Sequence, residues 1–396
     1  MGADRVIVIG AGIGGASAAL ALQRAGIDVR LFERAGELQD VGAGIQIWVN
    51  GMAALQRLGV LAAVQQNGEP MDVQELTSWR GTPLIRIPVA ELAERYGLPR
   101  PVLVKRADLL AVLTGALDDG VLELGSGVAA IEQDHDGVTV RLADGREERA
   151  AVVVSADGIG SETRKALFPP IEPRWSGYQY LRALSTHEDP SLPPEAFRFM
   201  IGRGDRFGLH AGRSWTYWFG VLLAKPESGD PPEGRRQQLL DRFRSFGPTV
   251  TDFIESVPDA EIGRTDIRDL DPLDRYVEGR VVLVGDAAHA TTPNLGRGAG
   301  EALEDAVAVA EHLSAASSLS DPGAVAEALR RFDEQRRPAA SEVQTRARRI
   351  GKLLGVRDPL RVAVREQLMR RVVGPRMLED VEAEFRELGV RASETA

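Results

Sequence analysis

The sequence predicts an α/β protein in which a parallel-sheet region is interrupted by a second, β-rich region and followed by C-terminal helices. Three observations predict this architecture. A short apolar run ends on a glycine-rich turn at 10–15 that leads into a helical pattern. Residues 171–268 carry loop prolines and clustered aromatics. A buried-strand pattern returns at 280–284, and the chain after it is mostly helical in pattern.

The glycine-rich turn has the sequence context of a dinucleotide-binding unit. Residues 6–9 are apolar and predict a buried strand, and residues 16–25 predict the helix after the turn. Gly10 permits the tight turn, Gly12 leaves room for a pyrophosphate, and Gly15 lets the helix pack closely on the strand. The free N–H groups and the dipole of the helix N-terminus then favour a phosphate.

An acidic residue completes this pattern. Glu33 follows the apolar run 29–32, about 20 residues after the turn, where a carboxylate can bind both hydroxyls of an adenosine ribose. An acid at this position argues against a 2′-phosphate at this site. Strand, turn, helix and acid together predict a Rossmann-like unit that binds FAD or NAD.

The next segments divide between this unit and a second region. Residues 41–47, which include Gln46, form a segment of small and apolar residues against which a cofactor can lie. Residues 71–90 alternate in polarity around a turn, and they predict a hairpin outside the nucleotide-binding unit.

After this hairpin the sequence from residue 102 predicts a strand end followed by a helix, and three more strands are expected beyond it. Residues 127–133 and 138–142 predict two of them, joined by a turn. Residues 151–155 predict a third, buried strand, which is followed by Asp157-Gly158.

The β-rich region 171–268 concentrates aromatic residues at 215–219. In a strand, Tyr217 would share one face with Trp215 and Phe219. That face would either line a substrate pocket or pack on the nucleotide-binding region, and both readings stay open.

A second motif begins where the strand 280–284 ends. Asp286 at the strand end can hold a hydroxyl of a ribityl chain. Gly298 and Ala299 precede a predicted helix, 301–313, and their N–H groups can bind an electron-rich carbonyl. Such a helix N-terminus would stabilise the negative charge of a reduced flavin, which NAD does not need. This motif therefore favours FAD.

Composition limits the alternatives. The 396 residues suggest two domains, or one large domain with an insertion. The net charge of −10 and the lack of a long basic run argue against nucleic acid as a partner. The chain has no cysteine, which excludes disulfides, thiolate catalysis and cysteine-ligated metals. With no apolar run of about 18 residues and no leader pattern, we expect a soluble, cytoplasmic protein without stable membrane association.

The C-terminal helices are rich in arginine. Interleaved apolar residues such as Leu360, Val364 and Leu368 make them amphipathic. A solvated basic face, a homodimer contact or a weak membrane-surface contact would each explain the pattern. The arginines are Arg330, Arg331, Arg336, Arg337, Arg346, Arg348, Arg349, Arg357, Arg361, Arg365, Arg370 and Arg371.

Three motifs in order give the chain a family resemblance. They are GAGIGG at 10–15 with Glu33-Arg34, ADGIGSETRK at 156–165, and GDAAHATTPNLGRG at 285–298. Over about residues 4–345 the chain resembles the single-component FAD-dependent aromatic hydroxylases, which include para-hydroxybenzoate, salicylate and urate hydroxylases. It departs from many of them in carrying Arg297 for glutamine, and from the urate enzymes in carrying Asn294 for aspartate.

The resemblance implies roles for individual residues. Arg106 would reach the pyrophosphate, Val128 would contact the adenine side through its backbone, and Asp157 would serve both FAD and a transiently bound NAD(P)H. Pro293 would lie beside the flavin ring near the substrate. With the residues predicted above, the candidate cofactor-binding residues are Gly10, Gly12, Gly14, Gly15, Glu33, Arg34, Gln46, Arg106, Val128, Asp157, Asp286, Gly298 and Ala299.

The resemblance also implies a division of the chain and a reaction. Residues 1–70, 101–170 and 269–345 would form a discontinuous FAD-binding domain, residues 71–100 and 171–268 the substrate domain, and residues 346–396 a helical segment. NADH or NADPH would reduce FAD, and O2 would add at the C4a atom to give a hydroperoxide that hydroxylates a small aromatic or heteroaromatic substrate. No metal is required.

Candidate catalytic residues lie in the substrate region and in the second motif. His210 is a candidate base near neutral pH, Tyr217 a pocket residue, and Arg206 a partner for a substrate anion, as is Arg182. Pro293 joins them from the cofactor loop, whereas we expect His289 to support that loop. An epoxidase or dehydrogenase on the same fold, and a non-catalytic flavin-binding protein, stay as alternatives.

Overall fold

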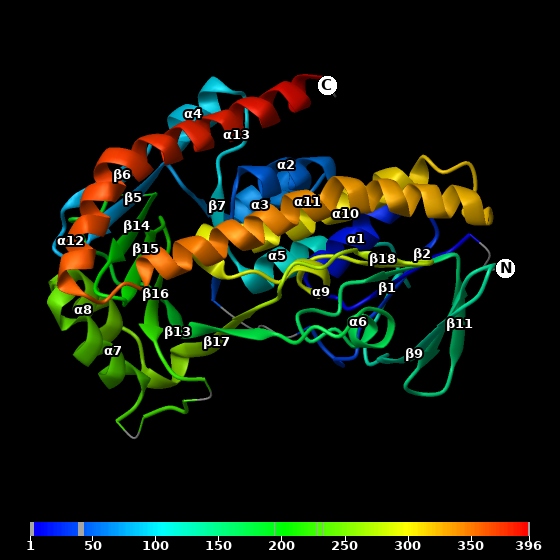
Figure 1. Cartoon of the computed structure of the whole chain (residues 1–396), viewed down its shortest axis with the longest axis horizontal. Helices are drawn as coiled ribbons and strands as arrows, with labels where there is room; N and C mark the ends of the chain where they lie inside the picture. Colours follow the sequence, from blue (N-terminus) through cyan, green and yellow to red (C-terminus); the bar gives the residue numbers. More distant parts are fainter. Residues whose placement is uncertain (1–3, 39–42, 194, 227, 232, 395–396) are drawn as a thin grey trace.

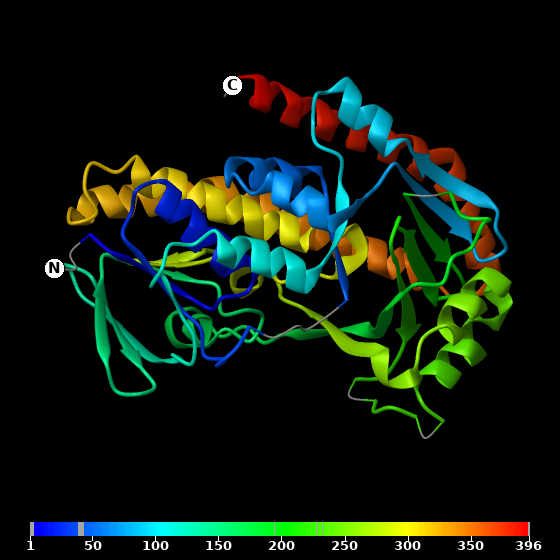
Figure 2. The ribbon, with the colours of Figure 1, turned by 180° about the vertical axis from the view of Figure 1, so that it is seen from behind.

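The structure is a computed structural model of the chain. Figures 1 and 2 show two β-rich halves joined by long helices. Positions 41 and 42 of the predicted segment 41–47 lie outside the described residues. The structure describes residues 4–38, 43–193, 195–226, 228–231 and 233–394, and side chains as far as residue 390.

A six-stranded sheet forms the core of the first half. Its order is β18-β19-β12-β1-β2-β8, parallel except for the edge strand β18. In β1, Val6 and Val8 pack into the helical layer, whereas Ile7 and Ile9 pack against β10, because neighbouring side chains of a strand point to opposite faces. The strands are β1 (Val6–Ile9), β2 (Val29–Phe32), β8 (Leu122–Glu123), β12 (Val152–Ser155), β18 (Val277–Glu278) and β19 (Val281–Leu283).

Helices cover one face of this sheet, and an antiparallel sheet covers the other. The helices predicted at 16–25 and 301–313 begin three residues earlier, at positions 13 and 298. The first N–H groups of a helix have no partner within the helix, so the small residues of these turns can form its first turn. The helices are α1 (Ile13–Arg24), α2 (Val49–Arg57), α3 (Leu61–Asn67), α5 (Arg106–Gly115) and α10 (Gly298–Ser314). The antiparallel sheet on the other face consists of β9 (Val128–Gln133), β10 (Val138–Leu142) and β11 (Glu147–Ala150). A further small sheet, in the order β3-β7-β4, consists of β3 (Gly44–Ile47), β7 (Val102–Lys105) and β4 (Gly68–Pro70).

A seven-stranded sheet, β17-β13-β16-β15-β14-β5-β6, forms the second half. The predicted hairpin is confirmed, since β5 and β6 pair antiparallel with Leu76 opposite Ile85. The strands are β5 (Val73–Ser78), β6 (Pro83–Ile87), β13 (Arg174–Ser185), β14 (Ala196–Ile201), β15 (Arg206–Ala211), β16 (Thr216–Leu223) and β17 (Gly263–Asp269). The short helices beside this sheet are α4 (Val89–Arg95), α7 (Arg235–Phe243), α8 (Pro248–Glu255) and the 3-10 turns Arg244–Phe246 and Asp259–Glu261. Helices α6 (Glu162–Leu167) and α9 (Asp286–His289) lie in the first half (Figure 1), and a 3-10 turn, Pro293–Leu295, follows α9.

The two faces of this sheet have different neighbours. Trp218 packs with Phe243 and Phe253 of α7 and α8. Tyr217 and Phe219 pack on the opposite face with Trp215. The predicted alternation along 215–219 is therefore confirmed.

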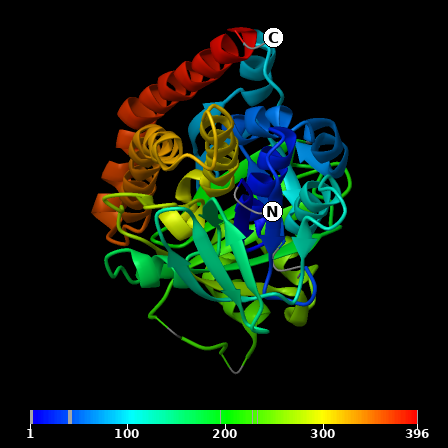
Figure 3. The same cartoon turned by 90° about the vertical axis from the view of Figure 1, so that its right-hand side faces the viewer.

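The C-terminal helices connect and cover the two halves. Helix α11 (Pro322–Leu354) runs along the molecule from one half to the other. Helix α12 (Pro359–Leu368), a π-helical segment (Met369–Val373) and α13 (Gly374–Glu394) follow, and in Figure 3 the red α13 lies along the upper edge of the molecule. Residue 345, the predicted end of the FAD-binding domain, lies inside α11. The domain division stays a prediction.

Candidate functional site

A cavity of about 1250 Å³ lies where the two halves meet. Its walls come from the N-terminal ends of α1 and α10, from β3, from one face of the seven-stranded sheet and from α13. Ten of the predicted site residues line it: Gly12, Gly14, Gln46, Arg106, Arg182, Tyr217, Asp286, Pro293, Gly298 and Ala299.

The glycine turn has the geometry that its sequence predicts. Gly10 has φ +92°, and a Cβ atom there would lie 2.7 Å from the carbonyl oxygen of Ala156. A Cβ atom on Gly15 would lie 1.8 Å from the Gly10 carbonyl oxygen, so this glycine lets α1 pack on β1. A Cβ atom on Gly12 would meet no described atom within 4 Å. The N-terminus of α1 therefore opens into the cavity beside Gly12 and Gly14.

The predicted ribose and adenine contacts lie together beyond the end of β2. The Glu33 carboxylate accepts hydrogen bonds from the N–H groups of Ala11 (2.7 Å) and Ala35 (2.9 Å). Ser126 N–H donates to the Glu33 carbonyl (2.8 Å), which brings the start of β9 at Val128 beside β2. Arg34 lies against Gly127. Glu33, Arg34 and Val128 are not among the described residues that line the cavity.

The second motif supplies the opposite wall. Asp286 follows β19 directly and lines the cavity at the start of α9. No side chain of the described residues caps the N-terminus of α10, so its first N–H groups, beside Gly298 and Ala299, are available to a ligand. Asp157 instead accepts hydrogen bonds from the Ser155 hydroxyl (2.6 Å) and the Thr163 N–H (3.2 Å), and it lies outside the described cavity lining.

Aromatic rings form the wall contributed by the seven-stranded sheet. Phe219 is at the centre, with the ring centroids of Tyr180 and Tyr217 at 5.2 and 5.6 Å. The Tyr217 ring reaches β3 because Gly44 has no side chain: a Cβ atom there would lie 3.0 Å from the ring. Burial raises the pKa of Tyr217 to about 12, so its hydroxyl stays protonated at neutral pH. Arg182 also lines this wall.

Two predicted catalytic residues are absent from the described cavity lining. His210 is fully buried, and its Nε2 atom lies 3.1 Å from the Pro70 carbonyl oxygen. Burial lowers the pKa of His210 to about 4, so the expectation of a base titrating near neutral pH is wrong. Arg206 is also fully buried. It donates to the Oδ1 atom of Asn294 (3.0 Å) and lies over the Tyr178 ring, so its direct contact is with the cofactor loop.

A buried ionic cluster, which was not predicted from the sequence, supports α10. His289 lies 2.5 Å from Asp305, whose other oxygen accepts from Arg336 (2.7 Å). Arg336 also pairs with Glu301 (2.8 Å). Arg336 and Arg365 are buried, so the reading of the C-terminal arginines as one solvated face is wrong for these two. The sequence contains one sign of this cluster: Glu301 and Asp305 lie four positions apart on a helix that is otherwise mainly apolar.

Arg297 connects this cluster to the last helix. It pairs with Glu301 (3.2 Å) on α10 and with Glu384 (2.6 Å) on α13. The indole N–H of Trp48 also donates to Glu384 (3.4 Å). Helix α13 is thereby held against the cavity, to which it contributes Val381.

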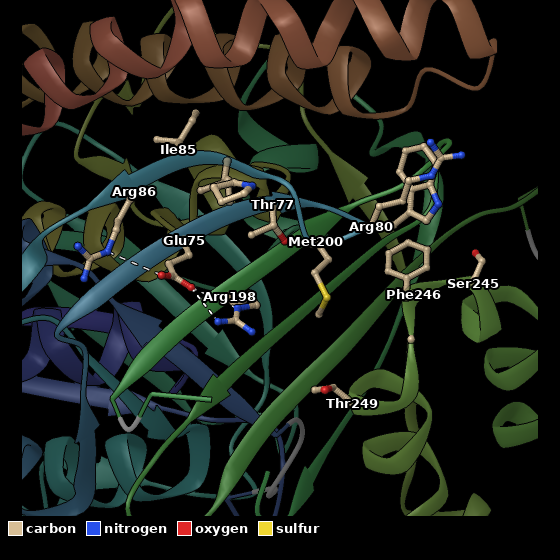
Figure 4. Close-up of a pocket in the computed structure, with 15 residues that line it drawn as sticks. Glu75, Thr77, Arg80, Ile85, Arg86, Arg198, Met200, Ser245, Phe246 and Thr249 are labelled. Carbon is tan, nitrogen blue, oxygen red and sulfur yellow. Dashed lines mark hydrogen bonds and ion pairs between the residues drawn. The ribbon is translucent and has the colours of Figure 1, made fainter. Parts of the chain in front are cut away.

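A second hollow, of about 580 Å³, lies on the other face of the β5–β6 hairpin and β14 (Figure 4). Glu75 lies between Arg198 (3.0 Å) and Arg86 (3.7 Å) there. The lining of this second hollow contains none of the residues of the three sequence motifs. Within the part of the chain that the structure describes, no cluster of three or more His, Asp or Glu side chains could hold a metal ion.

Comparison with known proteins decides the family. A family model described as "FAD binding domain" matches residues 4–347. The chain belongs to this family. It is 37% identical over 373 residues to an aurachin C monooxygenase/isomerase of Stigmatella aurantiaca, covering 94% of this chain and 95% of the relative. It is 32% identical to a FAD-dependent urate hydroxylase of Mycolicibacterium vanbaalenii, covering 90% of each chain.

Solved structures agree with this membership. The chain superposes on Klebsiella pneumoniae HpxO complexed with FAD and uric acid with a TM-score of 0.88, at 29% identity and 96% coverage of both chains. The predicted resemblance to single-component FAD-dependent hydroxylases is confirmed, and so are the α/β fold class and FAD as cofactor. The chain is a flavoprotein monooxygenase.

Proposed function

We propose that this monooxygenase uses NADH or NADPH and O2 to hydroxylate a small aromatic or heteroaromatic substrate. The observation that carries the proposal is one cavity with two chemically different walls. Tyr180, Tyr217 and Phe219 form an aromatic wall. On the other wall, the N-terminal ends of α1 and α10 supply N–H groups that can bind anionic groups.

The residues present fit FAD. Gly12 has open space where a side chain would be, and Gly14 also lines the cavity, so backbone can approach a pyrophosphate at α1. Asp286 can accept from a ribityl hydroxyl, and the N–H groups at Gly298 and Ala299 can bind the pyrimidine carbonyl. When bound, FAD would accept a hydride from NAD(P)H and activate O2 for transfer to an electron-rich carbon.

The chain's own side chains would orient the substrate and exclude water. Planar rings would stack on the aromatic wall, and the protonated hydroxyl of Tyr217 would donate a hydrogen bond. Arg182 has no ion pair among the described residues, so it is available for a phenolate or carboxylate of the substrate. Pro293 and Asn294 would close the side next to the cofactor, and Arg206 would position Asn294.

Relatives indicate the range of substrates. Their names include urate hydroxylase, 3-amino-4-hydroxybenzoate 2-monooxygenase and 6-hydroxynicotinate 3-monooxygenase. We propose a hydroxylated planar ring of similar size for this chain. A homodimer, a cytoplasmic location and the lack of stable membrane association stay predictions. No helix of the described residues is long and apolar enough to cross a membrane.

Stopped-flow absorbance of the purified flavoprotein tests the proposal. NADH or NADPH is mixed with the protein in the presence of phenols, hydroxypyridines or purines. A ligand that accelerates flavin reduction by orders of magnitude, followed by a hydroxylated product in oxygenated buffer, would support it. Reduction with no oxygenated product from any ligand would instead indicate a dehydrogenase, and an epoxide product would indicate an epoxidase.

Asp286→Ala tests the assignment of the cofactor site separately. We expect this variant to lose most of its FAD on gel filtration, because the ribityl chain loses its carboxylate partner. Asp271→Ala is the matched control, since Asp271 pairs with Arg348 outside the cavity lining. Full flavin occupancy of Asp286→Ala would contradict the role.

A further inference from the structure

Exposed apolar side chains gather on the C-terminal helices. Among the described residues, the exposed large hydrophobic side chains other than Leu124 all lie at positions 353–390. Figures 1 and 2 show α12 at one end of the molecule, beside β6 and α8. Four of these side chains form a stripe, with exposed fractions of 79% for Leu360, 59% for Val364, 45% for Leu368 and 40% for Val372.

The stripe is one face of a helix that the protein holds from its other side. Residues 360, 364, 368 and 372 recur every four positions and share one side of α12 and the π-helical segment. On the other side Val362, Arg365 and Met369 are buried. Arg365 donates to the carbonyl groups of Leu354 (3.2 Å) and Gly202 (2.9 Å), which fixes the helix on the body of the protein.

Positive charge surrounds this stripe. Residues 357–376 contain six arginines and two acidic residues in a chain whose net charge is −10. Arg361, Arg370, Arg371 and Arg376 are exposed, and their side chains have no ion pair with the described residues. Asp358 is used as the N-cap of α12, where it accepts from the Arg361 N–H (2.9 Å). The exposed face is therefore both apolar and cationic.

We propose that this face, the stripe with its four exposed arginines, binds reversibly to the surface of an anionic lipid membrane. Apolar side chains can enter the boundary between headgroups and acyl chains while guanidinium groups contact phosphates, as amphipathic helices do. A two-fold contact with a second copy of the chain would place these arginines opposite one another. Repulsion between their positive charges argues against a second copy as the partner. One short helix face without a lipid anchor gives weak, salt-sensitive binding.

Binding would bring the cavity close to the lipid. Met369, Val373 and Met377 line the cavity from the same helical segment that presents Leu368 and Val372 outward. The wall between the bound membrane and the cavity would be one helix, about 10 Å across. This inference does not depend on the substrate or on the reductant.

Vesicle co-sedimentation of the full-length flavoprotein tests the proposal. We expect at least about tenfold more protein bound to phosphatidylglycerol-containing vesicles than to pure phosphatidylcholine, and loss of binding at about 0.5 M salt. The triple variants Leu360→Ser/Val364→Ser/Leu368→Ser and Arg361→Gln/Arg370→Gln/Arg371→Gln should each lose this binding. Leu124→Ser, which removes an exposed leucine elsewhere, is the matched control and should bind like the parent.

Folding and self-association are measured in the same samples. Circular dichroism and bound FAD should be unchanged in both triple variants, since the substituted side chains are exposed. Equal binding to both vesicle types, no binding at all, or retained binding by both triple variants would overturn the proposal. A parent dimer that becomes a monomer in the leucine–valine variant, in sedimentation velocity without lipid, would assign the face to a second copy and would also overturn it.

Discussion

The Nη1 atom of Arg297 lies 2.6 Å from the Oε1 atom of Glu384, so an ion pair joins the loop before α10 to the last helix. Both side chains are about one-fifth exposed. Glu384 lies beyond residue 347, where the match to the family model ends. The cavity is therefore completed by a helix that lies outside the residues matched by the family model.

This ion pair should be measurable as a coupling between the two residues. Because water is largely excluded around them, we expect Arg297→Gln and Glu384→Gln to show a coupling energy of about 1–2 kcal/mol in a double-mutant cycle. Urea unfolding of the two single variants and the double variant gives this value. Arg95 and Glu382, a more exposed pair between α4 and α13, provide the control cycle and should couple more weakly. Additive single effects at positions 297 and 384 would show that the pair does not hold α13.

Gly15→Ala should damage both the fold and the cofactor site. The added Cβ atom would lie 1.8 Å from the Gly10 carbonyl oxygen, so β1 and α1 would have to move apart. We expect a loss of about 3 kcal/mol or more in the free energy of unfolding and weaker FAD retention. Gly115→Ala, where no described atom lies within 4 Å of the added Cβ atom, should stay within about 1 kcal/mol of the parent. Equal stability of the two variants would contradict this packing.

Tyr217→Phe should separate substrate orientation from flavin binding. The ring remains and the stacking surface is kept, but the protonated hydroxyl is lost. We expect kcat/KM to fall about tenfold with unchanged flavin content, because one hydrogen bond to the substrate is removed. Tyr96→Phe removes a hydroxyl that donates to Glu382 outside the cavity lining, and it should leave kcat/KM unchanged. An equal effect of both substitutions would argue against contact between Tyr217 and the substrate.

His289 should make stability depend on pH above the ordinary range of histidine. Burial opposes its charge, but the Asp305 carboxylate outweighs burial, and the pKa of His289 is raised above 6.5. A raised folded-state pKa means that the pair's contribution is fully present below pH 6.5 and is lost as pH rises through the raised value. Urea unfolding from about pH 6 to 9 should therefore show a decline that His289→Asn abolishes. His135→Asn, at an exposed position, is the control and should keep the parent's pH profile. If His289→Asn showed the same decline as the parent, the decline would belong to another group.

Local patterns predicted the elements that the cofactor needs. The strand before Gly10, the glycine turn and the acid after β2 follow from short-range constraints, since a tight turn without Cβ atoms and a helix N-terminus are encoded within a few residues. The alternation that places Tyr217 and Phe219 on one face is equally local. The motif at 285–298 likewise brought Asp286 and the start of α10 into the cavity.

Long-range packing decided the rest. Only the fold shows that His210 is enclosed and uncharged, that Arg206 reaches Asn294, and that Arg336 pairs with Asp305 across two helices. Burial and partners of a charged residue depend on segments far away in the chain, here 88 residues away for Arg206 and 31 for Arg336. The sequence by itself determined the fold class and the dinucleotide-binding unit, because these rest on local backbone geometry, and the order of its three motifs gave it the family resemblance. The tertiary structure alone decided which charges face the cavity and which helix closes it, because desolvation and ion pairing arise only where distant segments meet.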